Sequence, residues 1–164
     1  MTGVQTCALP IYRILYYESS RGCPFSCTYC LSGKEHGVRY RDLSLVRKEL
    51  QFFLDRKVKQ VKFVDRTFNA DPERALAIWR YIKDHDNGIT NFHFEIEADR
   101  MTPEEFRLLE GFRPGLIQME IGVQSANPMT LKSVHRNTSL DAVERMMKIL
   151  VPQQNINQIG RAHV

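Results

Sequence analysis

The order of predicted strands and helices constrains the fold of this 164-residue chain more than any other feature of its sequence. Four segments rich in β-branched and aromatic residues are each followed by a segment with apolar residues at helical spacing. The predicted strands are 12–18, 58–65, 90–99 and 116–125; the predicted helices begin near residues 43, 71, 102 and 139, with a short helical piece after residue 128. Four repeats of strand then helix predict a parallel sheet joined by right-handed crossovers, in one domain.

The third and fourth predicted strands alternate between apolar and polar residues. Residues 92–97 read Phe-His-Phe-Glu-Ile-Glu, and residues 117–124 read Ile-Gln-Met-Glu-Ile-Gly-Val-Gln. A parallel strand buried on both faces would be apolar throughout. The pattern therefore predicts a barrel-like sheet, with helices outside and a polar, ligand-holding interior. An open two-layer α/β sheet with one solvated face is the alternative.

The composition is that of an ordinary globular protein. Hydrophobic residues make up 43% of the chain and charged residues 26%, which excludes collagen-like and disordered classes. No apolar run approaches the roughly 20 residues that a membrane span requires, so we expect no membrane partner. The net charge is +4, but pairs such as Arg47-Lys48 and Arg56-Lys57 fall on predicted helix surfaces, and we expect no nucleic-acid partner.

Three cysteines lie within eight residues, directly after the first predicted strand. Cys23, Cys27 and Cys30 have the spacing C-x3-C-x2-C, and they fall at the end of the sheet where α/β barrels keep their chemistry. Three thiolates on one loop could hold an iron–sulfur cluster in which one iron has no protein ligand. Structural zinc is an alternative, but it normally takes four protein ligands, and only Cys7 or His36 offers a fourth. Disulfides, which would leave an odd thiol, and free cysteines are the remaining interpretations.

The cysteine loop and two later segments resemble a known enzyme family. Residues 18–30 read Glu-Ser-Ser-Arg-Gly-Cys-Pro-Phe-Ser-Cys-Thr-Tyr-Cys, residues 37–41 read Gly-Val-Arg-Tyr-Arg, and residues 63–69 read Phe-Val-Asp-Arg-Thr-Phe-Asn. This sequence is similar to radical S-adenosylmethionine (radical SAM) enzymes, and it particularly resembles the branch that carries an upstream cobalamin-binding domain. The resemblance extends over residues 12–150.

The resemblance implies the fold, the cofactors and the reaction class. The fold would be a partial (β/α)6 TIM-like barrel of which about the first four βα units are present. A 4Fe–4S cluster held by Cys23, Cys27 and Cys30 would bind S-adenosylmethionine and cleave it reductively to a 5′-deoxyadenosyl radical for hydrogen abstraction. The branch implies cobalamin-dependent methyl transfer or cyclisation on an unknown substrate. Such an enzyme needs an electron donor such as flavodoxin or ferredoxin, and an oxygen-sensitive cluster favours the cytoplasm.

The resemblance also implies seven residues that bind the cofactor, and none that is assigned as catalytic. They are Tyr17, Tyr29, Asp65, Thr67, Glu97, Gln124 and Arg136. Tyr17 matches a tyrosine that contacts the cofactor, and Tyr29 matches the aromatic position that covers the adenine. Glu97 matches an acid that holds the cofactor, Gln124 a glutamine near the ribose, and Arg136 an arginine that pairs the cofactor carboxylate. The alternatives are core packing for Tyr17, packing within the loop for Tyr29, an interior salt bridge for Glu97 and an ordinary surface position for Arg136.

One family segment is altered in this chain. Where the family often has a Gly-Gly-Glu segment after the second strand, to receive the methionine amino group, this sequence has Asp65-Arg66-Thr67. The resemblance therefore assigns that contact to Asp65 or Thr67.

The two ends of the chain look foreign to the rest. Residues 6–11 and 159–164 can be encoded by complementary DNA, and both resemble translations of a short-read sequencing adapter. We therefore expect residues 1–11 and 159–164 to be artefacts, which sets aside Cys7 and His163, and residues 12–158 to be a truncated radical SAM core domain. Such a piece would leave the fourth strand with an exposed edge and would have weak or no activity alone. A tRNA methylthiotransferase-like radical SAM enzyme and a zinc-stabilised nucleic-acid-binding module are the alternative functions.

Overall fold

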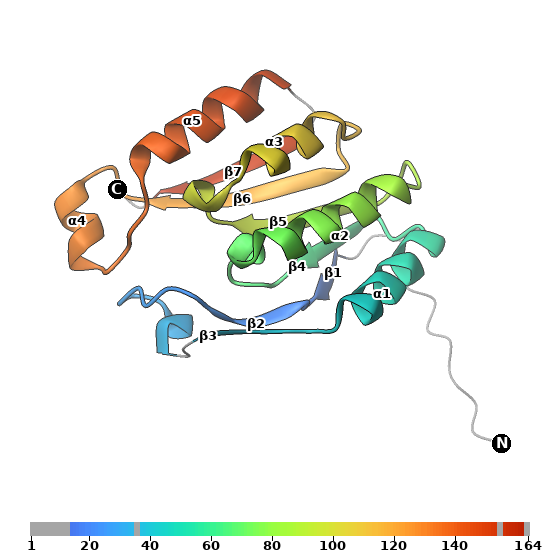
Figure 1. The fold of residues 1–164 in the computed structure, drawn as a ribbon, viewed down its shortest axis with the longest axis horizontal. Coiled ribbons are helices and arrows are strands. Elements are labelled where there is room, and N and C mark those ends of the chain that lie inside the picture. Colours follow the sequence, from blue (N-terminus) through green and yellow to red (C-terminus); the bar gives the residue numbers. More distant parts are fainter. Residues whose placement is uncertain (1–13, 35–36, 154–155, 163–164) are drawn as a thin grey trace.

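A parallel sheet forms the centre of the computed structural model, which describes residues 14–34, 37–153 and 156–162. Its five strands have the order β1-β4-β5-β6-β7, so that each strand lies beside the next one along the chain (Figure 1). Their bounds are β1 (Ile14–Tyr17), β4 (Gln60–Phe63), β5 (Asn91–Ile96), β6 (Ile117–Gln124) and β7 (Ile156–Ala162). The helices are α1 (Leu43–Asp55), α2 (Pro72–Asp84), α3 (Pro103–Glu110), α4 (Pro128–Ser133) and α5 (Leu140–Leu150). The predicted α/β fold with sequential parallel strands is confirmed.

The long helices begin where local sequence provides a cap. The Asp42 carboxylate accepts hydrogen bonds from two amides at the start of α1, and Asp71 accepts one at the start of α2. Thr102 and Glu105 form a capping box at the start of α3, and the Ser139 hydroxyl caps α5. None of the helices among the described residues is long and apolar enough to span a membrane.

The helices α1, α2, α3 and α5 cover one face of the sheet (Figure 1). The apolar positions of β5 and β6 point into this layer: Phe92, Phe94, Ile117 and Met119 are fully buried there, beside Trp79 of α2. Sequential parallel strands with every crossover helix on the same side are the arrangement of a barrel segment.

The opposite face of the sheet carries polar side chains, as the alternation in β5 and β6 predicts. Glu120 Oε2 lies 3.0 Å from Lys62 Nζ and 3.3 Å from His93 Nε2, while Glu95 Oε1 lies 3.6 Å from the same lysine nitrogen. His93 and Glu120 are buried, and Glu95 is half-buried. These charged side chains are partly or fully buried, and they pair with one another. Both observations favour a barrel interior over an open, solvated sheet face.

One pair of strands was not predicted, and one prediction about strands was wrong. β3 (Gly37–Tyr40) pairs antiparallel with β2 (Ser20–Cys23), where the sequence analysis named no strand. The hairpin depends on Gly22, whose φ is +100° and whose added Cβ would lie 2.2 Å from the Gly37 carbonyl oxygen. The fourth predicted strand was expected to have an exposed edge, but β6 pairs with β7 along its length. β7 includes residues 159–162, whose foreign origin stays a prediction; Cys7, His36 and His163 lie outside the described residues.

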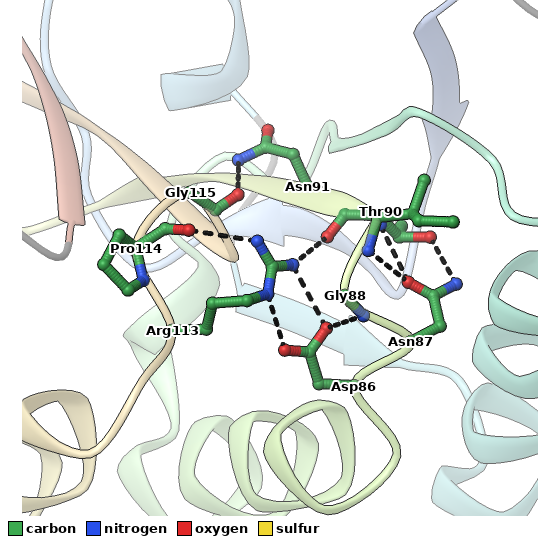
Figure 2. A network of polar contacts seen from close by, with 9 residues as sticks. Asp86, Asn87, Gly88, Thr90, Asn91, Arg113, Pro114 and Gly115 are labelled. Atoms are coloured by element: carbon green, nitrogen blue, oxygen red, sulfur yellow. Dashed lines mark hydrogen bonds and ion pairs between the residues drawn. The ribbon is translucent and has the colours of Figure 1, made fainter.

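A polar network ties together the loops at the amino-terminal edge of the sheet (Figure 2). The Arg113 guanidinium donates to both carboxylate oxygens of Asp86, at 2.8 and 3.1 Å, and to the carbonyls of Thr90 and Pro114. Asn87 accepts from two backbone amides and donates to the Leu54 carbonyl at 2.7 Å. These bonds fix the starts of β5 and β6, at the end opposite to the cysteine loop.

Candidate active site

A cavity of about 200 Å³ lies between the cysteine loop and the carboxyl ends of β4, β5 and β6. Eight of the residues that line it were predicted from the sequence to hold the cluster or the cofactor. They are Cys23, Cys27, Cys30, Tyr29, Thr67, Glu97, Gln124 and Arg136. The structure thus brings together residues that are up to 113 positions apart in the chain.

The cysteine loop lies between the two strands of the β2–β3 hairpin and is bonded to the end of α4. Cys23 is the last residue of β2, and the Cys30 amide donates to the Cys27 carbonyl at 3.1 Å. The Thr28 amide donates to the Val134 carbonyl, also at 3.1 Å, which fastens the loop to the segment that leads to Arg136. All three cysteines are free thiols, and Cys23 Sγ lies 3.6 Å from Thr67 Oγ1.

Glu97 and Arg136 form a buried ion pair at one wall of the cavity. Arg136 Nη2 lies 2.6 Å from Glu97 Oε2 and donates to the Gly122 carbonyl at 2.5 Å, while the Thr138 hydroxyl donates to Glu97 Oε1 at 3.1 Å. Burial raises the pKa of the Glu97 carboxyl, and the adjacent guanidinium opposes that rise. Burial works to lower the pKa of Arg136, but Glu97, Tyr29 and Cys27 together outweigh it, and the net direction is upward. The pair presents a fixed guanidinium that can bind a carboxylate.

The end of β6 has an unusual backbone where it meets the cavity. The pairing of β6 with β7 is irregular between Gly122 and Gln124, and Gln124 has a φ of +66°. A Cβ on Gly122 would lie 2.7 Å from Gln124 Nε2, so a larger residue there would displace the end of the Gln124 side chain. A non-glycine residue in the left-handed region at a ligand cavity is the kind of strain that functional sites retain.

Tyr29 lies at the mouth of the cavity and is 53% exposed. Partial burial and the neighbouring Cys27 raise the pKa of its phenol, while the positive charge of Arg136 works in the opposite direction. An exposed aromatic ring beside the three thiols is suitably placed to cover a flat group bound in the cavity.

Two of the predicted cofactor ligands do not line the cavity. Asp65 is 1% exposed; its carboxylate accepts hydrogen bonds from the Ser19 amide at 2.7 Å, the Ser19 hydroxyl at 2.5 Å and the Ser20 hydroxyl at 2.9 Å. Tyr17 packs edge-on against Phe63 on the helix side of the sheet, and its hydroxyl donates to Glu49 at 2.6 Å. The Tyr17 pKa is raised, first by burial and then by Glu49. Asp65 thus supports the segment that leads into the cysteine loop, whereas Tyr17 is part of the core between the sheet and α1.

The cavity also has lining residues that the sequence analysis did not assign to the site. They are Phe25, Arg66, Glu95, Ile96, Glu120 and Gly122. Glu95 and Glu120 belong to the predicted polar face and lie one pleat deeper than Glu97. The alternation of apolar and polar residues in β5 and β6 therefore indicated that both side chains point to the cavity side of the sheet. Burial and the charge of Glu120 raise the pKa of Glu95.

The donor set fits an iron–sulfur cluster and a polar cosubstrate. Among the described residues, no three His, Cys, Asp or Glu side chains lie close enough to hold one metal ion, whereas a cluster takes a different iron for each cysteine. Nε of Arg136 is buried beside the cavity and has no hydrogen-bond partner in the part of the chain that the structure describes. The fold and site thus define a class: a parallel α/β barrel segment with a three-thiolate site at the carboxyl ends of its strands.

The chain belongs to the radical SAM superfamily, whose sequence model matches residues 17–154. Two curated relatives are methyltransferases by name. An uncharacterised methyltransferase of Pyrococcus horikoshii is 29% identical over 138 residues, which is 79% of this chain and 29% of the relative. Bacteriochlorophyllide d C-12(1)-methyltransferase of Chlorobaculum tepidum is 27% identical over 126 residues, covering 74% of this chain and 27% of the relative. The chain thus spans less than a third of the length of these relatives.

Solved structures with the same fold include cobalamin-dependent enzymes. The radical SAM methyltransferase TsrM of Kitasatospora setae, with cobalamin and a [4Fe–4S] cluster bound, matches with a TM-score of 0.76 and 16% identity over 91% of this chain and 30% of TsrM. The cobalamin-dependent radical enzyme OxsB matches with a TM-score of 0.72 and 21% identity over 90% of this chain and 23% of OxsB. The predicted partial TIM-like radical SAM fold is confirmed.

Proposed function

We propose that this chain is the S-adenosylmethionine-activating core of a radical SAM enzyme. The observation that carries the proposal is that the three cysteines and the Glu97–Arg136 pair line one cavity at the carboxyl ends of the strands. When bound there, a 4Fe–4S cluster supplies the electron that cleaves S-adenosylmethionine to a 5′-deoxyadenosyl radical.

The residues of the chain would bind and orient the reactants. Cys23, Cys27 and Cys30 would hold the cluster, each through its thiolate. The Arg136 guanidinium, kept charged and in place by Glu97, would bind the carboxylate of S-adenosylmethionine. The strained Gln124 would hydrogen-bond the ribose, and the ring of Tyr29 would cover the adenine and restrict the entry of water.

The reaction of the whole protein would be a cobalamin-dependent methyl transfer. Both curated relatives carry the name of methyltransferases, and TsrM and OxsB, whose structures share the fold, hold cobalamin. We propose an upstream domain for the cobalamin, a small electron-transfer protein such as flavodoxin or ferredoxin as the electron donor, and the reducing cytoplasm as the compartment.

The proposal is tested by anaerobic reconstitution of this chain with iron and sulfide, followed by electron paramagnetic resonance of the reduced protein. We expect a reduced 4Fe–4S signal that changes when S-adenosylmethionine is added. Cys27→Ala should abolish the signal, whereas Ser26→Ala, which alters an exposed residue of the same loop, should retain it. Stoichiometric binding of zinc without a cluster would refute the proposed function. A cluster signal that does not change when S-adenosylmethionine is added would refute it as well.

A further inference from the structure

Asn69 is fully buried and pairs with the backbone of Glu97 through both ends of its side-chain amide. Its Nδ2 donates to the Glu97 carbonyl at 2.9 Å, and its Oδ1 accepts from the Glu97 amide at 2.9 Å. Asn69 has no exposed surface and does not line the cavity, so it does not touch a ligand there. A side-chain amide that makes both bonds takes the place of a peptide group in a neighbouring strand.

Asn69 bonds to Glu97 just beyond the point where the pairing of β5 with its neighbouring strands ends. The β4–β5 ladder runs from the Gln60–Asn91 pair to the Lys62–His93 pair, and the β5–β6 ladder ends at the Ile96–Ile121 pair. Glu97 is therefore the first residue beyond both ladders. Its side-chain position depends on whatever fixes its backbone there, and Asn69 supplies two bonds to that backbone.

Asn69 also links the two walls of the cavity. It lies in the 3₁₀ turn η2 (Phe68–Ala70), two residues after Thr67, whose hydroxyl lies 3.6 Å from Cys23 Sγ. On the other side, the Glu97 carboxylate binds Arg136 at 2.6 Å. A short run of covalent and hydrogen bonds thus connects the cysteine loop to the guanidinium.

We propose that Asn69 is a positioning residue that sets the place of the Glu97–Arg136 pair relative to the cysteine loop. The inference rests on the proposed function, since a molecule bound both at the cluster and at Arg136 must span the distance that Asn69 fixes. Loss of the two Asn69–Glu97 hydrogen bonds leaves every side chain that lines the cavity in the protein. It allows Glu97, and with it Arg136, to move. In metal sites, loss of a hydrogen-bond partner of a ligand typically weakens metal binding by about 10- to 100-fold, and we expect a comparable effect on a molecule that Arg136 binds.

The test compares Asn69→Ala with Asn87→Ala. Asn87 also bonds backbone groups across a loop, but at the opposite edge of the sheet (Figure 2), so its variant controls for lost stability. Each reconstituted chain is titrated with S-adenosylmethionine while the cluster signal is followed by electron paramagnetic resonance. We expect Asn69→Ala to keep its cluster and to bind S-adenosylmethionine at least about tenfold more weakly. Asn87→Ala should bind with the affinity of the unchanged chain.

A second variant keeps the inference testable if Asn69→Ala does not fold. Asn69→Asp has the same shape and keeps the acceptor for the Glu97 amide, but at pH 8 it lacks the donor to the Glu97 carbonyl. We expect a several-fold weaker affinity with the cluster intact. An unchanged affinity in either folded Asn69 variant overturns the inference while leaving the proposed function in place. An unchanged chain that shows no response to S-adenosylmethionine overturns the proposed function itself.

Discussion

Replacing Asp65 by alanine should destabilise the protein before it affects any ligand. The family resemblance makes Asp65 a cofactor ligand, whereas the structure makes it a buried acceptor for Ser19 and Ser20, just before the cysteine loop. The two assignments differ in what the substitution does to the protein without its cluster. A ligand would leave the free energy of unfolding nearly unchanged, and a buried support would lower it.

The size of the effect follows from the three hydrogen bonds. Each bond to a charged group contributes about 1.5–3 kcal/mol, so three bonds set an upper range of about 4.5–9 kcal/mol. Burial of the carboxylate opposes this, because desolvation raises the Asp65 pKa and costs several kcal/mol. We expect a net loss of about 3 kcal/mol for Asp65→Ala, which corresponds to a decrease in Tm of about 6–12 °C for a chain of this length.

Urea unfolding of the reduced, cluster-free protein measures this loss directly. Asp65→Asn serves as the control, since its amide keeps an acceptor for the Ser19 amide and can donate to a serine hydroxyl; we expect it to lose about 1 kcal/mol. An Asp65→Ala protein within 1 kcal/mol of the unchanged chain, but with weakened binding of S-adenosylmethionine after reconstitution, would refute the structural role.

Two further predictions concern charged side chains away from the cavity. Burial raises the pKa of Glu105, which is fully buried in its capping box, so its contribution to stability is present at low pH and is lost as the pH rises through the folded-state pKa. Glu105→Gln should therefore flatten the decline in the free energy of unfolding as the pH rises above the ordinary pKa of a glutamate, about 4.3, and an unaltered slope would contradict the assignment. Arg113→Met should lose about 2 kcal/mol at pH 7, because two bonds to Asp86 and two to carbonyls are removed from a partly exposed site. Burial works to raise the pKa of the Asp86 carboxyl, but the hydrogen bonds from Arg113 and the Gly88 amide bring it below its ordinary value. The loss caused by Arg113→Met should therefore shrink as the pH falls below the ordinary pKa of an aspartate, about 3.9, and a loss that is independent of pH would exclude the ion pair.

Features encoded over a few neighbouring residues were predicted from the sequence. The alternation in β5 and β6 identified the helix-facing and interior faces, because side chains along a strand point to opposite sides in turn. Thr102 and Glu105 marked the start of α3, since a capping box depends on residues three positions apart. The cysteine spacing located the site, because the loop directly follows a strand of a parallel sheet.

The tertiary structure alone decided which polar groups meet. Asp65 faces Ser19 across 46 positions, Asn69 faces Glu97 across 28, and Glu97 meets Arg136 across 39. The sequence analysis placed the carboxylates of Asp65 and Glu97 at or beside the site. Residue spacing, however, does not identify a hydrogen-bond partner that is so far away in the chain. A buried carboxylate must be paired or hydrogen-bonded, and the partner is the donor that the packed sheet brings within reach. The sequence by itself determined where the chemistry lies, and the packing of β4, β5 and the loop before Arg136 determined which residues face the cavity and which hold them there.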